Sequence, residues 1–271
     1  MKFFSLLGLA VFFLAACNNA NTEKAVTSAE VSTMESNLQN AIQHFPDSLL
    51  LRENLIQYFS DIKNYPKAIQ ETEKVLSKDS NNIRFWHIKA QLYFFAEDTL
   101  NSIKAYEKCI DIFPDPGDLM DLGSLYAATK NPNALAIADA LIIGKKADAE
   151  KEALFIKGLY YTFLGEKMKA IGFFDQCLQL DYTFMFAYRE KAIALYDLAK
   201  YEEALEVLDK ALTLQNGFDE GYYWEGRCLE KLNKQSSAIE SYQSAIAAAQ
   251  QNNDDNQEAR DALARLGIKT P

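Results

Sequence analysis

The sequence predicts an all-α fold, a solenoid built from helix-turn-helix repeats. The first observation is a small residue that returns every 34 positions. This column contains Ala68, Ser102, Ala136, Ala170, Ala204 and Ala238. A fixed period of this length is typical of helical repeat arrays, in which each unit packs only on its neighbours. Such arrays mainly bind partners, so the period already favours recognition over catalysis.

Two further columns keep the same period, which separates a true repeat from a chance spacing of alanines. Seven residues after each small position stand Val75, Cys109, Ile143, Cys177, Ala211 and Ala245. Twelve residues before the small position, four of the units have Ala90, Gly158, Ala192 and Gly226. Positions three, four and seven residues apart share one face of a helix. Each unit is therefore predicted to contain two helices that face each other through small side chains.

The best-defined unit spans residues 83–116 and carries a recognisable pattern. It places Trp86, Lys89, Ala90, Tyr93, Ser102, Tyr106 and Pro114 in order. This unit resembles the tetratricopeptide repeat, and the resemblance implies a right-handed α-solenoid. The next unit has Leu122, Gly123 and Tyr126 one residue early relative to Ala136. We interpret the slip as one extra residue in the turn at 130–133.

The period divides the chain into units and two capping segments. We expect six full units, at 49–82, 83–116, 117–150, 151–184, 185–218 and 219–252. Residues 29–48 are predicted to form an N-terminal capping helix, the second helix of an incomplete unit. Residues 253–271 are predicted to form a C-terminal capping helix and tail. Asp254 or Asp255 would cap its start, and Gly267 would end it in the left-handed conformation.

The first residues resemble a bacterial lipoprotein signal. Lys2 is followed by an apolar or small run from Phe3 to Ala16 and then by Cys17. The run is shorter than a membrane-spanning helix and has a signal-peptide layout. The resemblance implies a cleaved signal peptide at 1–16, lipid attachment at Cys17 and a flexible polar linker at 17–28. It also implies a lipid anchor in the cell envelope, with the outer membrane favoured and the face of that membrane left open.

The charge and the remaining cysteines exclude several functions. The chain carries 28 basic and 38 acidic residues, a formal net charge of −10. This charge opposes binding to nucleic acid. Cys109 and Cys177 occupy the same repeat column, and Cys228 also lies on a predicted helix. We interpret all three as packed core residues without a disulfide.

Catalytic and metal-binding patterns are absent from the sequence. The two histidines, His44 and His87, have no His or Cys three or four residues away, as a metal site would need. Gly123 and Ser124 lie inside a predicted helix and do not form a nucleophile elbow. Gly144 and Lys145 lack the rest of a phosphate-binding loop. We therefore expect no cofactor, no metal and no enzymatic activity.

The resemblance to tetratricopeptide repeats implies that the first helix of each unit lines a concave groove. The candidate groove residues are Phe94, Phe95, Phe155, Phe163, Phe186, Arg189, Tyr196, Tyr223 and Arg227. Aromatic residues and arginine are enriched at binding hot spots, and such a groove would suit a peptide with apolar anchors. The alternative is that several of these side chains fill the space between adjacent repeats.

These features together predict a membrane-anchored, non-catalytic scaffold for protein interactions in the bacterial cell envelope. Its partners would be proteins or peptides, and its membrane contact would be the N-terminal lipid. The alternative is a surface lipoprotein that binds glycans or small molecules on the same repeat scaffold. The near absence of insertions between the six units disfavours that alternative.

Overall fold

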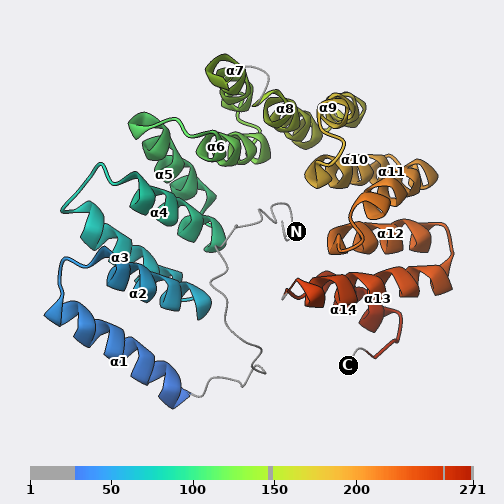
Figure 1. Ribbon diagram of the computed structural model, residues 1–271. Helices are drawn as coiled ribbons and strands as arrows, with labels where there is room; N and C mark the ends of the chain where they lie inside the picture. The colour runs from blue at the N-terminus through green and yellow to red at the C-terminus, as the bar shows by residue number, and fades with distance from the viewer. Residues whose placement is uncertain (1–27, 146–148, 253, 270–271) are drawn as a thin grey trace. The chain divides into compact units, whose positions relative to one another are not determined.

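The computed structural model describes residues 28–145, 149–252 and 254–269, and within them it contains fourteen helices and no strand (Figure 1). The helices are α1 (Ser28–His44), α2 (Leu49–Asp61), α3 (Tyr65–Leu76), α4 (Ile83–Phe95), α5 (Thr99–Ile112), α6 (Pro116–Ala128), α7 (Asn133–Lys145), α8 (Glu150–Leu164), α9 (Lys167–Leu180), α10 (Met185–Asp197), α11 (Tyr201–Leu214), α12 (Asp219–Lys231), α13 (Gln235–Gln251) and α14 (Gln257–Arg265). None of these helices is both long enough and apolar enough to cross a bilayer. Cys17 and the predicted signal peptide lie outside the described residues.

The chain divides into two compact units, residues 1–55 and 56–271. In the larger unit each helix from α3 to α14 packs against the next one along the chain. Alternate helices also touch, because α6 contacts α8, α8 contacts α10 and α10 contacts α12. This pattern of antiparallel pairs stacked on their neighbours confirms the predicted all-α repeat fold.

Short polar side chains begin several of the helices. Asn64, Asn82 and Asp98 each accept a hydrogen bond from a backbone N–H three residues later, at the starts of α3, α4 and α5. At the C-terminal helix the cap is Asn256, which accepts from the N–H of Ala259 at 3.0 Å. The prediction that Asp254 or Asp255 caps this helix was therefore wrong by one or two residues.

A residue with positive φ recurs in the turn inside each unit. These residues are Lys63, Glu97, Lys130, Gly165, Ala199 and Asn233. They follow the 34-residue step, except that Lys130 comes one residue early. The left-handed conformation reverses the chain between the paired helices, and all but Gly165 adopt it against the steric cost of a β-carbon. Gly267 has a φ of +79°, which confirms the predicted left-handed end of α14.

The small-residue columns mark the closest approach of the paired helices. Ala68, Ser102, Ala170, Ala204 and Ala238 are completely buried. Gly226 packs so closely that an added β-carbon would lie 2.6 Å from the Tyr242 ring, and Gly158 packs in the same way on Phe174. A larger side chain at these positions would separate the two helices, as the periodicity indicated.

The unit at 117–150 departs from the predicted register. Ala136 is exposed and Ile143 is 82% exposed, whereas Ala134 and Leu141 are buried in their places. The predicted extra residue in the turn at 130–133 was also wrong. Ala134 comes four positions after Lys130, whereas Ala204 comes five positions after Ala199. The helix α7 is apolar on nearly every face, so the hydrophobic pattern left more than one register open.

The three cysteines in the described residues are free and buried. The sulfur of Cys109 lies 3.9 Å from the carbonyl oxygen of Ile83, and that of Cys177 lies 3.4 Å from the carbonyl oxygen of Lys151. Burial raises the pKa of each thiol to about 12. These findings confirm the prediction that they pack in the core and do not form disulfides.

Candidate functional site

The predicted groove residues lie on α4, α8, α10 and α12, the first helices of four units, and several of them form bridges to a neighbouring unit. Three hydrogen-bonded pairs join residues 31 positions apart: His87 with Asp118, Arg189 with Glu220, and Arg227 with Tyr196. The rings of Phe155 and Phe186 make a fourth contact at the same spacing, with centroids 6.4 Å apart. This spacing is one repeat less one helical turn, so each bridge joins a first helix to the next.

Phe155 and Arg189 are committed to packing between repeats. Phe155 is 4% exposed and its ring centroid lies 5.3 Å from that of Phe184. Arg189 is 5% exposed and donates to Glu190 at 2.9 Å and to Glu220 at 2.6 Å. Its guanidinium also lies over the ring of Phe186, which is half-buried. These side chains therefore fill the space between adjacent repeats, which was the alternative to their lining a groove.

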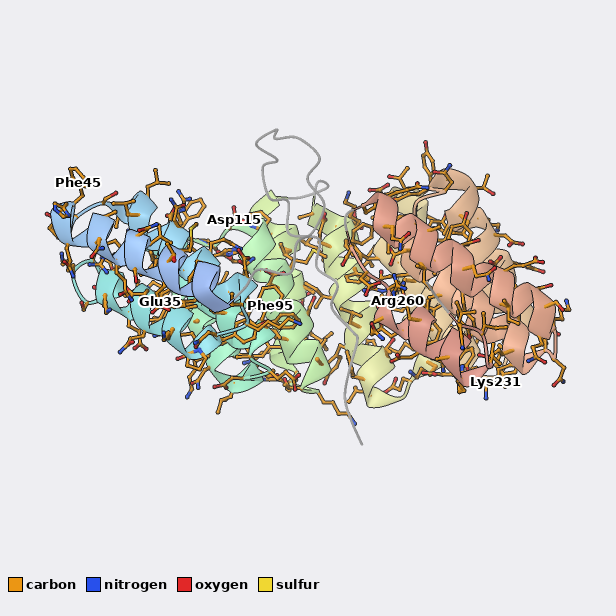
Figure 2. All side chains as sticks on the ribbon, turned by 90° about the horizontal axis from the view of Figure 1, so that it is seen from below. Glu35, Phe45, Phe95, Asp115, Lys231 and Arg260 are labelled. Atoms are coloured by element: carbon orange, nitrogen blue, oxygen red, sulfur yellow. The ribbon has the colours of Figure 1, made fainter. Side chains whose placement is uncertain are left out.

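Three other candidates lie at the ends of their helices. Phe94 is half-buried. Phe95, which is labelled in Figure 2, is 46% exposed. The Phe95 ring stacks on Tyr65 of α3 at a centroid distance of 6.3 Å. Phe163, near the end of α8, is half-buried. None of the three lines the pocket described next.

Tyr196, Tyr223 and Arg227 converge on one pocket with a volume of about 530 Å³. Tyr196 comes from α10, Tyr223 and Arg227 come from α12, and the opposite wall is α14. The remaining lining residues are Glu230, Lys231, Glu258, Asp261, Ala262 and Arg265. The pocket therefore lies where the last two units meet the C-terminal helix. Its volume is within the range of small-ligand pockets.

Arg227 lines this pocket, and three aromatic rings lie near its guanidinium. Its guanidinium carbon is 5.0 Å from the ring centroids of Tyr196 and Trp224 and 5.7 Å from that of Tyr223. It donates to the hydroxyl of Tyr223 at 3.0 Å and to the hydroxyl of Tyr196 at 3.2 Å. The rings hold the guanidinium in place by cation–π attraction while its charge is not neutralised.

The wall of the pocket mixes charges of both signs. Glu230 accepts hydrogen bonds from Arg265 at 2.8 Å and from the hydroxyl of Tyr242 at 2.5 Å. Lys231, Glu258 and Asp261 are exposed at the rim. The sequence predicted a C-terminal capping helix but gave no sign that this helix would meet α12. That meeting depends on how the helix docks, which periodicity does not specify.

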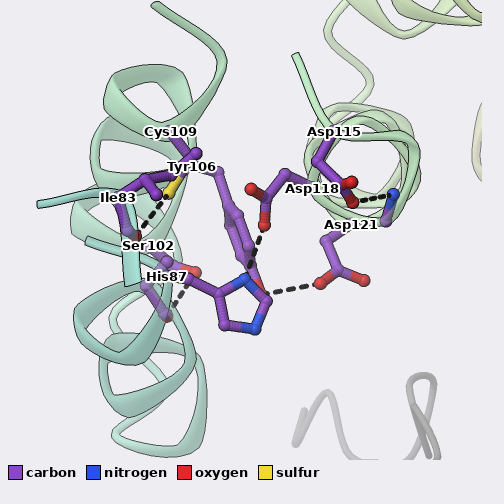
Figure 3. A network of polar contacts seen from close by, with 10 residues as sticks. Ile83, His87, Ser102, Tyr106, Cys109, Asp115, Asp118 and Asp121 are labelled. Carbon is purple, nitrogen blue, oxygen red and sulfur yellow. Dashed lines mark hydrogen bonds and ion pairs between the residues drawn. The ribbon is translucent and has the colours of Figure 1, made fainter. Parts of the chain in front are cut away.

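A second polar cluster lies between the units at 83–116 and 117–150 (Figure 3). The Nδ1 atom of His87 is 2.5 Å from the carboxylate of Asp118, and the Tyr106 hydroxyl donates to Asp121 at 2.8 Å. The hydrogen bond to Asp118 raises the pKa of His87, against an opposing effect of burial. Burial raises the pKa of Asp121 to about 6. The sequence missed this cluster because the partner of His87 is 31 residues away.

The arrangement of these groups does not suggest metal binding. Within the described ranges, no group of three or more His, Cys, Asp or Glu side chains is placed to hold a metal ion. The carboxylates of the second cluster instead face a tyrosine and a histidine. The pocket at α10, α12 and α14 is the candidate site, and aromatic and charged side chains line it.

Comparison with known proteins gives the class of this molecule. Residues 83–116 and 189–254 each match the tetratricopeptide repeat family. The chain therefore contains tetratricopeptide repeats, as the unit at 83–116 indicated. The second segment includes Tyr196, Tyr223 and Arg227, so most of the pocket is built from matched repeats.

Individual relatives are distant. Protein FlbA of Caulobacter vibrioides is 29% identical over 185 residues, which cover 56% of this chain and 31% of FlbA. The chain thus spans about a third of that relative. A tetratricopeptide repeat protein from Parabacteroides merdae superposes with a TM-score of 0.69 at 18% identity, covering 88% of this chain and 92% of the other. PilW, a type IV pilus biogenesis factor, gives 0.56 at 18% identity, covering 79% and 97%. These structures share the fold.

Proposed function

We propose that this protein is a membrane-anchored, non-catalytic scaffold that binds a protein partner in the bacterial cell envelope. The observation that carries the proposal is the convergence of Tyr196, Tyr223 and Arg227 on one pocket. Two neighbouring repeats supply these side chains, and the C-terminal helix closes the other side. Tyrosine and arginine in a concave site are the residue types that dominate protein-binding energy.

The absence of an evident catalytic arrangement in the pocket supports binding without chemistry. Arg227 is held by two hydroxyls and three rings, and Glu230 is bonded to Arg265 and Tyr242. Neither group faces a Ser, Cys or His that could act as a nucleophile with it among the lining residues. A pocket of this volume has room for a peptide side chain together with part of its backbone.

Photocross-linking in cells tests the scaffold function. We would place a photoreactive amino acid at Lys231, on the exposed pocket rim, and as a control at Lys210, which is exposed on α11 and does not line the pocket. We expect the Lys231 position to capture a specific protein and the Lys210 position to capture none. Adding Tyr196→Ala should abolish the capture. Equal capture from both positions would contradict the proposed site.

The envelope location is a separate part of the proposal and has its own test. It is supported by the signal-like segment that ends at Cys17, a residue outside those described. Two acyl chains would anchor the protein stably, since each buried CH₂ contributes about 0.8 kcal/mol. We expect the full-length protein in the membrane fraction and a Cys17→Ala variant in the soluble fraction. Membrane association of that variant would refute lipid anchoring at Cys17.

A further inference from the structure

We propose that the pocket at α10, α12 and α14 recognises an acidic side chain of a peptide, presented between neutral or basic neighbours. Arg227 and Lys231 would bind the carboxylate. The inference rests on the proposed scaffold function and adds the chemistry of the partner. It is drawn from Arg227, a half-buried cation of this pocket that has no carboxylate partner among the described residues.

Between residues 89 and 260, the buried and half-buried lysines and arginines other than Arg227 are each bonded to a carboxylate. Lys167 lies 2.5 Å from Asp197, and Arg189 lies 2.6 Å from Glu220. The same holds for Lys151 with Asp181, Lys157 with Asp139, and Lys191 with Asp175. This is expected, because removing a charge from water is costly unless an opposite charge replaces the solvent.

Arg227 differs from all of these cations. Its side chain is half-buried, yet its hydrogen-bond acceptors are the neutral hydroxyls of Tyr196 and Tyr223. No carboxylate among the described residues lies within 4.0 Å of it. A guanidinium has five N–H donors, so donors remain after the two bonds to tyrosine. A carboxylate in the pocket would supply both the missing charge and the missing acceptors.

The carboxylate of Glu230 does not fill this role. It lines the same pocket, but it is bonded to Arg265 and to the hydroxyl of Tyr242. Lys231, the next residue along α12, adds a second positive charge on the rim and makes no ion pair within the described part of the chain. The α12 side of the pocket therefore carries two cations that a single acidic side chain can bind together.

The rim on α14 limits what can flank that acidic side chain. Glu258 and Asp261 are exposed and line the pocket from α14. Further acidic residues on the partner would approach these carboxylates and be repelled, whereas lysine or arginine would be attracted. The pocket should therefore prefer one acidic residue in a neutral or basic segment over an acidic run.

Binding of short peptides to the full-length protein tests the inference by fluorescence anisotropy. The probe has blocked ends and one central glutamate flanked by serine and lysine, and the matched peptide has glutamine instead. We expect the glutamate peptide to bind at least about tenfold more tightly. In Arg227→Gln the difference should fall below about twofold. Lys231→Gln, an exposed change, should reduce it, and Lys210→Gln should leave it unchanged.

Three results would overturn the inference: equal affinity for the two peptides, no binding of either, or the full preference for glutamate in Arg227→Gln. A peptide whose glutamate is flanked by further glutamates should bind more weakly, and tighter binding would exclude the role of Glu258 and Asp261. Failure of the scaffold function is distinguishable. If cross-linking from Lys231 captures a partner that Arg227→Gln still binds, the scaffold stands and the acidic-residue inference fails.

Discussion

The buried carboxylate of Asp121 gives a quantitative prediction about stability and pH. Its side chain is 7% exposed, one oxygen accepts from Tyr106, and the other has no hydrogen-bond partner. Burial raises its pKa from 3.8 to about 6, so the folded protein binds this proton more tightly than the unfolded chain does. One pKa unit corresponds to about 1.4 kcal/mol, so ionised Asp121 costs the fold up to about 3 kcal/mol.

The direction in which stability changes with pH follows from the pKa values of Asp121 in the unfolded and the folded protein. Below pH 3.8 the acid is neutral in both the folded and unfolded states. Between pH 3.8 and about 6 the unfolded chain loses the proton first, so stability falls as the pH rises. His87 acts in the same sense, because its pKa is raised and its stabilising charge is lost as the pH rises through that value. The junction between these two repeats should be most stable in mild acid.

The test is Asp121→Asn, which keeps an acceptor for Tyr106 and removes the ionisable group. We would compare urea unfolding of the variant and the natural protein between pH 4 and pH 8. The variant should gain about 1 to 3 kcal/mol relative to the natural protein as the pH rises. Asp209→Asn, an exposed change on α11, serves as the control and should show no such trend. A difference that stays constant with pH, or grows toward acid, would refute the reasoning.

Three further predictions concern packing and backbone strain. Ala199→Gly should stabilise the fold by about 1 kcal/mol in urea unfolding, because Ala199 has a φ of +58°; no gain would mean that the turn is unstrained. Ala204→Leu should cost about 1 to 3 kcal/mol by overpacking, whereas Ala136→Leu should cost under about 0.5 kcal/mol because Ala136 is exposed. Cys109 should resist iodoacetamide until the protein unfolds, and rapid native alkylation, read by mass spectrometry, would contradict its burial.

The repeat could be predicted from the sequence because the positions where paired helices touch accept only small side chains. Ala204 and Gly226 show this, since their positions admit almost no extra volume. The same reasoning failed at Ala136, where α7 is apolar around its circumference and no polar face marks the solvent side. The 34-residue period predicts which residues of a helix are buried only where one face is apolar and the other is polar.

The candidate site was predictable only in part. Tyr196, Tyr223 and Arg227 could be named from their columns, because the columns mark first-helix positions. Their proximity to Asp261 and Arg265 could not be predicted, because α14 does not belong to the 34-residue repeat. Its docking is determined by tertiary packing. The role of Arg189 was open for the same reason, since the carboxylate of Glu220 that binds it lies one repeat further along.

The bridges between first helices limit which units of this array can be removed or exchanged. Three junctions use different pairs: histidine with aspartate at the first, phenylalanine with phenylalanine at the second, and both arginine with glutamate and tyrosine with arginine at the third. Removing the unit at 185–218 would place Phe155 opposite Glu220 and leave that glutamate without Arg189. The units are therefore not interchangeable modules, and their order along the chain is specified by the chemistry of each junction.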